Sequence, residues 1–323
     1  MKKRAQNLAA ESRFALPMVM AYAIAIWLIS GLLIPVIPFT AAELVRGAWV
    51  QFACFLVSAY LMVELNNSNA LIRIYSRMVS CSFLVLSCAA NFLFSSMAGA
   101  IVQLCVIAFY IALFRCYQNK ASMGWTYYSF LCIGLASTAY VHILFYVPVL
   151  WAIMFFQLTS LSWRTFAASV LGLLTPYWFI LPFYIYQGDT GTFISHVAQL
   201  AVFVRPFDYR MLSLNQLLFF IFIVALAVTG IVHYWRNSYN DRIRIRQFYG
   251  SFIGMSIVTT IFLMLQPQHY DILIRILIVN VSPLIAHFIS LTHTRITNIA
   301  FYTICGVALL LTILNLWMPS LSF

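Results

Sequence analysis

Apolar segments of about 17–23 residues recur along the whole chain, and this repeated length restricts the fold more than any other feature. A helix of that length crosses a hydrocarbon core of about 30 Å. Hydrophobic residues make up 64% of the sequence and charged residues 8%, and the mean hydropathy is +0.95. A soluble fold has too little interior to hide so much apolar surface. The sequence therefore predicts an all-α polytopic membrane protein, with residues 1–323 forming a single integral membrane domain.

The first apolar segment, Phe14–Ile37, follows a basic start but is too long for the core of a signal peptide, which spans about 7–15 residues. We therefore expect it to be a retained span. Ten further candidate spans are 47–64, 78–95, 97–114, 125–141, 143–158, 166–186, 214–235, 248–265, 272–289 and 297–317. The pairs within 78–114 and 125–158 have almost no connecting loop, so each is either two tight half-hairpins or one long kinked helix. We expect about eleven spans, within a range of nine to eleven.

The distribution of basic residues predicts the orientation of these spans. With eleven spans and a cytoplasmic N-terminus, fourteen basic residues face the cytoplasm: Lys2, Lys3, Arg4, Arg13, Arg73, Arg77, Arg115, Lys120, Arg164, Arg236, Arg242, Arg244, Arg246 and Arg295. Four face the other side: Arg46, Arg205, Arg210 and Arg275. This asymmetry follows the positive-inside rule and predicts a multi-pass protein with a cytoplasmic N-terminus and an external C-terminus, which lies in the periplasm if the cell is Gram-negative. The net charge of +11 is explained by orientation and by attraction to anionic lipid headgroups, without nucleic acid as a partner.

Several helices are expected to be short or irregular. Pro148, Pro176 and Pro283 fall within candidate spans and predict kinks. The longest external loop, Gln187–Leu212, contains an apolar stretch of about 13 residues, which is too short to cross the membrane. We expect this stretch to form an interfacial helix against the outer membrane surface.

The external loops contain the candidate functional residues. Three acids, Glu43, Asp208 and Asp271, are candidate catalytic groups. Three arginines, Arg205, Arg210 and Arg275, are candidates for binding a substrate phosphate. Arg275 is the best single candidate, because a charge inside an apolar span is costly unless it has a partner. The alternative is that these groups are solvated or form ion pairs between loops; Asp271 and Arg275, four residues apart on one helical face, form such a possible pair. No metal-binding motif is recognised, and the sequence does not identify a cofactor.

Several motifs carry a family resemblance. They are Ile133-Gly134-Leu135-Ala136-Ser137, Tyr146-Val147-Pro148-Val149-Leu150-Trp151, Ser162-Trp163-Arg164, Leu171-Gly172-Leu173-Leu174-Thr175-Pro176-Tyr177 and Asn280-Val281-Ser282-Pro283-Leu284-Ile285-Ala286-His287. Together they resemble a family of bacterial multi-span inner-membrane proteins without assigned biochemistry. The Gly-Leu-Ala-Ser and Tyr-x-Pro pattern also resembles the membrane-embedded GT-C glycosyltransferases, which use polyprenyl-phosphate donors. That resemblance implies that Glu43 is the counterpart of their loop-one acid and that an external arginine binds phosphate. The first loop here is short, with one acid, and no soluble domain follows the spans.

Three functions are compatible with these features. The first is an envelope protein of GT-C-like architecture that binds or acts on a polyprenyl-phosphate-linked or other lipid-phosphate substrate at the periplasmic face. The second is a non-catalytic subunit of an inner-membrane secretion or envelope-assembly complex, with other proteins as partners. The third is a transporter, which is less favoured because we find neither an internal repeat nor several acids in one span. The sequence leaves open whether the protein is an enzyme.

Overall fold

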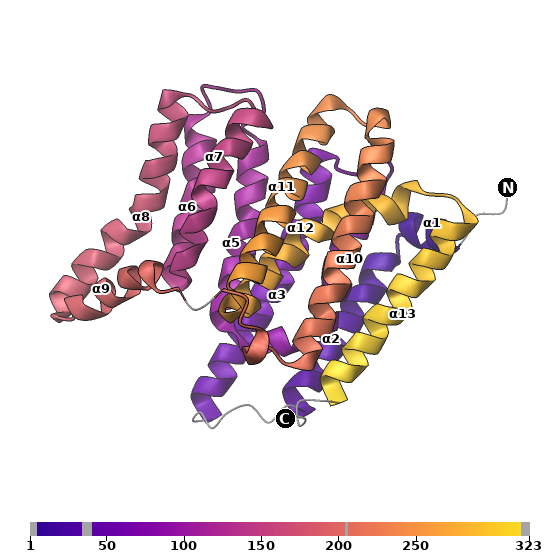
Figure 1. Ribbon diagram of the computed structural model, residues 1–323, viewed down its shortest axis with the longest axis horizontal. Helices are drawn as coiled ribbons and strands as arrows, with labels where there is room; N and C mark the ends of the chain where they lie inside the picture. The colour runs from indigo at the N-terminus through magenta and orange to yellow at the C-terminus, as the bar shows by residue number, and fades with distance from the viewer. Residues whose placement is uncertain (1–4, 34–40, 204–205, 318–323) are drawn as a thin grey trace.

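A computed structural model describes the chain except for residues 1–4, 34–40, 204–205 and 318–323, and it describes only the backbone of 32–33 and 41–46. The described residues form helices and turns without strands (Figure 1). The α-helices are α1 (Ala5–Glu11), α2 (Ala15–Leu33), α3 (Ala41–Asn69), α4 (Met78–Ala89), α5 (Met97–Phe114), α6 (Met123–Ala139), α7 (Val147–Phe156), α8 (Trp163–Gln187), α9 (Thr190–Ala198), α10 (Leu214–Asn237), α11 (Ile243–Leu265), α12 (Tyr270–Leu291) and α13 (Arg295–Trp317). Short 3-10 helices are η1 (Asn91–Ser95), η2 (Val141–Tyr146), η3 (Gln199–Ala201), η4 (Tyr209–Met211), η5 (Ser238–Asn240) and η6 (Pro267–His269).

The expected apolar segments coincide with helices, so the all-α prediction is confirmed. Within the described residues, seven helices are long and apolar enough to cross a membrane, and they lie in α3, α5, α8, α10, α11, α12 and α13. An eighth span results if α1 and α2, which meet at an angle of 89°, are counted together. The predicted total of eleven spans is therefore not confirmed by length and composition.

Helix ends follow from local capping residues. Ser162 and Ser213 each begin a helix with a capping box. The serine side chain accepts from the backbone N–H three residues later, and the side chain of that later residue accepts from the serine backbone N–H. Helix α8 ends at Gly188, whose φ of 73° is a left-handed conformation that favours glycine. The external loop then forms α9, so a short helix is present where the sequence predicts one. Pro148 begins α7 instead of interrupting a helix, because a proline at this position loses no helical hydrogen bond.

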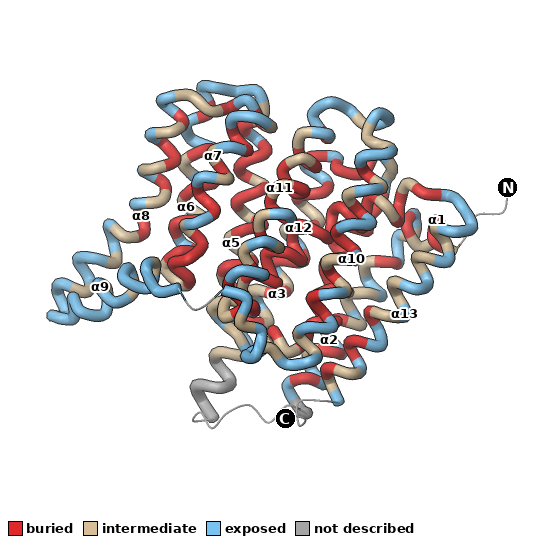
Figure 2. The backbone as a smooth tube through the Cα atoms, in the orientation of Figure 1, coloured by how far each residue is buried: buried red, intermediate tan, exposed pale blue. Residues whose placement is uncertain are grey.

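Helix α12 is the centre of the bundle, and nearly all of it is buried (Figure 2). It packs against α4, α5, α10 and α11, and Gly230 of α10 allows close approach to Leu284 of α12. At the periphery, α8 packs mainly against α6, and most of its other faces are exposed (Figure 2). Gly134 and Gly172 make that contact possible, because a methyl group at Gly172 would lie 2.5 Å from the carbonyl oxygen of Tyr127.

The two ends of the bundle differ in charge. The turns 115–122, 157–162 and 238–242 lie together at one end, which we call the basic end (Figure 1). Helices α9, η4 and η6 lie toward the opposite end, which we call the far end (Figure 1). Arg115, Lys120, Arg164 and Arg244 all belong to the turns and first helical residues of the basic end. The basic residues that the sequence analysis assigned to one side of the membrane are thus concentrated, in these turns, at one end of the bundle.

Candidate functional site

Polar side chains run along the buried helix α12. Arg275 is 4% exposed and His287 is 1% exposed, and Asn280, Ser282 and Ser290 are fully buried between and beside them. Arg275 and His287 are twelve residues apart, or about 18 Å along the helix axis. Ionisable groups inside an apolar bundle are costly to bury and often mark functional positions. We therefore examine the surroundings of Arg275 and His287 as two separate centres.

Arg275 binds neutral oxygen atoms from α5 and η1. Its Nη1 donates a hydrogen bond to Oε1 of Gln103 at 3.0 Å. Its Nη2 donates to the carbonyl oxygens of Leu93 and Ser96, the latter at 3.4 Å. No ion pair with Asp271 is present among the described side chains, although Asp271 lies one helical turn away. Arg275 is thus hydrogen-bonded to neutral dipoles, and Asp271 acts on its charge only through space, without a direct ion pair.

A small cavity lies beside the Arg275 guanidinium. Its volume of about 10 Å³ is sufficient for roughly one water molecule. The cavity is lined by Arg275 and by Trp27, Gln51, Phe55, Ser58, Phe94, Ala100 and Gln103. We call Arg275, Gln103, Gln51 and this cavity the Arg275 niche. Its walls come from α2, α3, η1 and α5. The niche therefore has α2 and α3, the helices before and after the first loop, on one side, and the break between η1 and α5 on the other.

Gly99 lies directly against the Arg275 side chain. A methyl group at Gly99 would lie 2.6 Å from Nε of Arg275 and 2.9 Å from Cδ. The arginine stem therefore lies directly against the first turns of α5. The guanidinium is held in one position by this contact and by its hydrogen bonds.

The other predicted site residues are placed as follows. Asp271 is exposed at the start of α12. Arg210 is exposed in η4, and the half-buried Asp208 just before η4 accepts a hydrogen bond from the Arg210 backbone N–H at 3.3 Å. The neighbouring Tyr209 donates to the carbonyl of Met264 at 3.0 Å, so the second external loop contacts the end of α11. No described contact joins Asp208 or Arg210 to Arg275. Glu43 lies in α3 with only its backbone described, and Arg205 lies outside the described residues.

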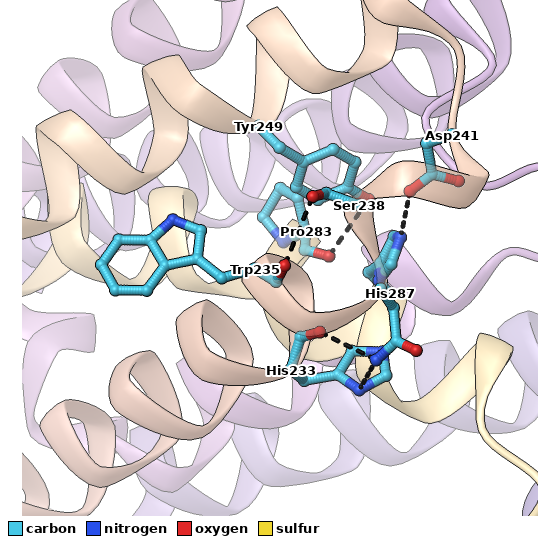
Figure 3. Close-up of polar contacts among 8 residues, drawn as sticks. His233, Trp235, Ser238, Asp241, Tyr249, Pro283 and His287 are labelled. Carbon is cyan, nitrogen blue, oxygen red and sulfur yellow. Dashed lines mark hydrogen bonds and ion pairs between the residues drawn. The ribbon is translucent and has the colours of Figure 1, made fainter.

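The second centre joins α12 to the turn between α10 and α11 at the basic end. Nε2 of His287 lies 2.9 Å from Oδ2 of Asp241, and the two side chains are 1% and 3% exposed (Figure 3). Asp241 directly follows η5, and its carboxylate points toward α12 instead of capping α11 (Figure 3). A buried carboxylate with an imidazole partner is held in position by a charge-assisted hydrogen bond. The pair therefore ties the α10–α11 turn to the central helix.

Aromatic rings surround the Asp241–His287 pair. Tyr249 lies 5.0 Å from the His287 ring, centroid to centroid, and donates a hydrogen bond to the Pro283 carbonyl at 3.4 Å. Tyr234 stacks on Tyr249 with centroids 4.7 Å apart, and its hydroxyl has no hydrogen-bond partner among the described protein groups. Nδ1 of His287 also lacks a protein partner. The pair is thus enclosed by rings. The Tyr234 hydroxyl and Nδ1 of His287 beside it have no hydrogen-bond partner among the described residues.

No known protein family, curated protein or solved structure matches this chain. The family resemblances seen in the sequence therefore remain predictions, and the function must be argued from the two centres themselves.

The two centres differ in the chemistry that they can support. The Arg275 niche has a cation without a direct ion-pair partner and neutral hydrogen-bonding side chains, so it is suited to an anion. The Asp241–His287 pair is enclosed and already hydrogen-bonded, so it is suited to holding helices together. Among the described residues, no group of three or more His, Cys, Asp or Glu side chains is arranged to hold a metal ion.

Sequence reasoning identified Arg275 as a buried cation that needs a partner, but it identified neither the partners of Arg275 nor the Asp241–His287 pair. Two signals pointed to the second centre. Asp241 is the one acid among Arg236, Arg242, Arg244 and Arg246, and His287 is an ionisable residue within an apolar span. Neither signal specifies that residues 46 positions apart would meet.

Proposed function

We propose that this protein binds a lipid-phosphate substrate, polyprenyl-linked or otherwise, at the outer face of a bacterial inner membrane, with Arg275 as the phosphate-binding group. The observation that carries the proposal is the buried Arg275 guanidinium, which has only neutral partners. A cation that is hydrogen-bonded but not neutralised retains its attraction for an anion, and that attraction is strong where water is excluded. Exposed Asp271, one turn before Arg275, is the candidate base closest to the niche in sequence.

The position of the niche favours a ligand that arrives from the membrane. Its cavity is bordered by Trp27 of α2 and by Phe55 and Gln51 of α3. The rings of Trp27 and Phe52 lie 4.4 Å apart and bridge α2 and α3 on that side. A phosphate is larger than the present cavity, so we propose that binding separates these two rings and exchanges the Gln103 oxygen for a phosphate oxygen. The apolar chain of the lipid would then lie between α2 and α3.

The proposal includes the predicted membrane arrangement. Added end to end, α4 with η1 reaches about 28 Å, and η2 with α7 reaches about 27 Å. Helix α6, with 17 residues, reaches about 26 Å. Each is close to the hydrocarbon thickness of about 30 Å. Together with the eight longer spans they give eleven crossings, with the basic end in the cytoplasm, the C-terminus in the periplasm and α9 at the outer membrane surface.

The test measures binding of farnesyl phosphate and undecaprenyl phosphate to detergent-purified protein by native mass spectrometry. We expect wild-type protein to bind and Arg275→Lys to bind at least tenfold more weakly, because lysine keeps the charge but loses the two-pronged grip on phosphate. Arg295→Lys, an exposed arginine at the start of α13, is the matched control and should bind as wild type. Gel filtration and thermal unfolding establish that each variant is folded. Absence of wild-type binding, or equal binding by a folded Arg275→Lys variant, contradicts the proposal.

A second candidate function is supported by α8. This helix exposes large aromatic side chains, among them Trp178 at 78% and Tyr186 at 91%. Aromatic faces of this kind also suit a neighbouring protein helix, as expected for a non-catalytic subunit of an inner-membrane assembly. Purification in mild detergent tests this function: a stoichiometric protein partner that is lost on Trp178→Ala and Tyr186→Ala substitution supports the subunit, and its absence favours lipid binding alone.

A further inference from the structure

An open groove runs between α6 and α8 at the basic end. Its volume is about 560 Å³, within the range of roughly 300–1,000 Å³ typical of ligand sites. Its lining residues are Met123, Gly124, Tyr127, Tyr128, Trp163, Arg164, Ala167, Ala168 and Leu171. The groove is separate from the Arg275 niche and shares no lining residue with it. We infer that this groove is a binding site for an anionic phospholipid, with the headgroup phosphate at Arg164 and one acyl chain along the groove.

Charge is the first argument for an anionic occupant. Arg164 is exposed in the groove, and no residue that the structure describes forms a hydrogen bond or ion pair with its side chain. The chain has no Asp or Glu between Glu64 and Asp189, so neither α6 nor α8 can neutralise it. The Ser162 hydroxyl donates to the Lys120 carbonyl at 2.9 Å, which brings a second cationic residue of the basic end next to the start of α8.

The backbone at the same corner adds to this positive potential. Helices α6 and α8 both begin there, and Met123, Gly124, Trp163 and Arg164 belong to their first turns. Free N–H groups and the helix dipole make such positions favourable for a phosphate. The N-cap residue of α6, Ser122, makes no side-chain hydrogen bond to that turn. The backbone N–H groups of these first turns add to the positive potential that Arg164 provides in the groove.

The rest of the groove identifies the anion as a lipid. Below the first turns, the walls are apolar or aromatic: Ala167, Ala168 and Leu171 on α8 and Tyr127 on α6. Trp163 is 81% exposed at the groove entrance, where an amphipathic ring is suited to the headgroup zone. A soluble phosphate would bind Arg164 and leave the apolar part of the groove empty. A phospholipid with a net negative headgroup uses both.

The test titrates detergent-purified full-length protein with phosphatidylglycerol or phosphatidylcholine and counts bound lipid by native mass spectrometry. We expect one phosphatidylglycerol molecule to bind with at least tenfold preference over phosphatidylcholine. Arg164→Gln should weaken it about tenfold, the effect of one charge-assisted hydrogen bond. Arg244→Gln is the matched control, because Arg244 is also an exposed second residue of a helix at the basic end.

A second variant blocks the groove without removing charge. A side-chain carbon added at Gly124 would meet nothing within 4 Å, so Gly124→Leu fits the fold and fills the groove. We expect it to weaken phosphatidylglycerol binding by tenfold or more, while Arg244→Gln binds as wild type. Equal binding of both lipids, unchanged binding in Arg164→Gln and Gly124→Leu, or displacement of the lipid by millimolar inorganic phosphate would each overturn the inference. Displacement would identify a simple anion site without lipid selectivity.

Discussion

Replacing Gln103 by Glu tests whether the charge of Arg275 is available to a ligand. Glutamate has nearly the shape of glutamine, and Oε1 of Gln103 already lies 3.0 Å from Nη1 of Arg275. The new carboxylate would attract the guanidinium by about 4 kcal/mol at an effective dielectric constant of 20. Position 103 is 4% exposed, so burial of the new charge costs several kcal/mol. These two terms offset each other, and we expect the stability of the fold to change by less than about 2 kcal/mol.

The effect on ligand binding should be much larger than the effect on stability. A carboxylate at position 103 neutralises Arg275 and repels a phosphate, so the attraction of about 4 kcal/mol is lost and affinity falls at least a hundredfold. The assay pairs equilibrium unfolding in mixed micelles with native mass spectrometry of farnesyl phosphate binding. Gln103→Leu is the matched control, because it removes the hydrogen-bond acceptor without adding charge. If Gln103→Glu binds the lipid phosphate as tightly as wild type, Arg275 is a structural group and the niche is not the binding site.

Three further substitutions test the packing at the two centres and between α6 and α8. Asp241→Ala leaves the Nε2–H of His287 buried without an acceptor, and we expect a loss of about 3 kcal/mol in unfolding free energy, measured by denaturant titration in micelles. Gly99→Ala places a methyl group against the arginine stem and should cost about 1.5–3 kcal/mol, one charge-assisted hydrogen bond of Arg275, in the same titration. Gly172→Ala forces α8 away from α6 and should raise hydrogen exchange in α8 while leaving α12 protected.

Matched control substitutions separate these losses of stability from the loss that any substitution of the same kind would cause. Asp208→Ala removes a half-buried acid with one backbone hydrogen bond and should change stability by less than about 1 kcal/mol. Gly306→Ala and Gly254→Ala add a methyl group where nothing lies within 4 Å, and a helical alanine should stabilise by up to about 1 kcal/mol. An Asp241→Ala loss no larger than about 0.6 kcal/mol, the average for a neutral hydrogen bond between membrane helices, would show that the pair is not charge-assisted.

The helices could be predicted because apolar length is a local property of the sequence. The candidate span 97–114 coincides with α5 (Met97–Phe114), and 214–235 lies within α10 (Leu214–Asn237). The short helix in the loop after α8 was also predictable, because an apolar stretch that cannot cross still forms a helix, and Asp189 caps it by accepting from the Thr192 N–H at 3.2 Å. Capping and hydrophobic length act over a few residues, so one sequence is sufficient to identify them.

The candidate site was less predictable because its partners are distant in the chain. The cost of a bare charge indicated that Arg275 needs a partner, and that reasoning is correct. It favoured Asp271, the near acid, whereas the described partners are Gln103 and two backbone carbonyls more than 170 residues away. Every residue has a backbone carbonyl, so the order of side chains does not show which carbonyl will accept from Arg275. The contact between Asp241 and His287 likewise depends on how the α10–α11 turn folds back onto α12.

The break between α4 and α5 explains why Arg275 can be buried at all. The last carbonyl groups of a helix have no N–H partner in the next turn, so the end of η1 presents acceptors inside the bundle. The Leu93 carbonyl accepts from the Ser96 N–H at 3.1 Å and from Gln51 at 3.4 Å, and it still receives Arg275. An unbroken α-helix through residues 90–96 would direct these carbonyls along its own axis, and of the three described acceptors only Gln103 would remain for the guanidinium. The irregular segment and the buried cation therefore depend on each other. A ligand that binds at the niche must replace the Gln103 contact and not the backbone ones, because the backbone contacts hold the end of η1 against α12.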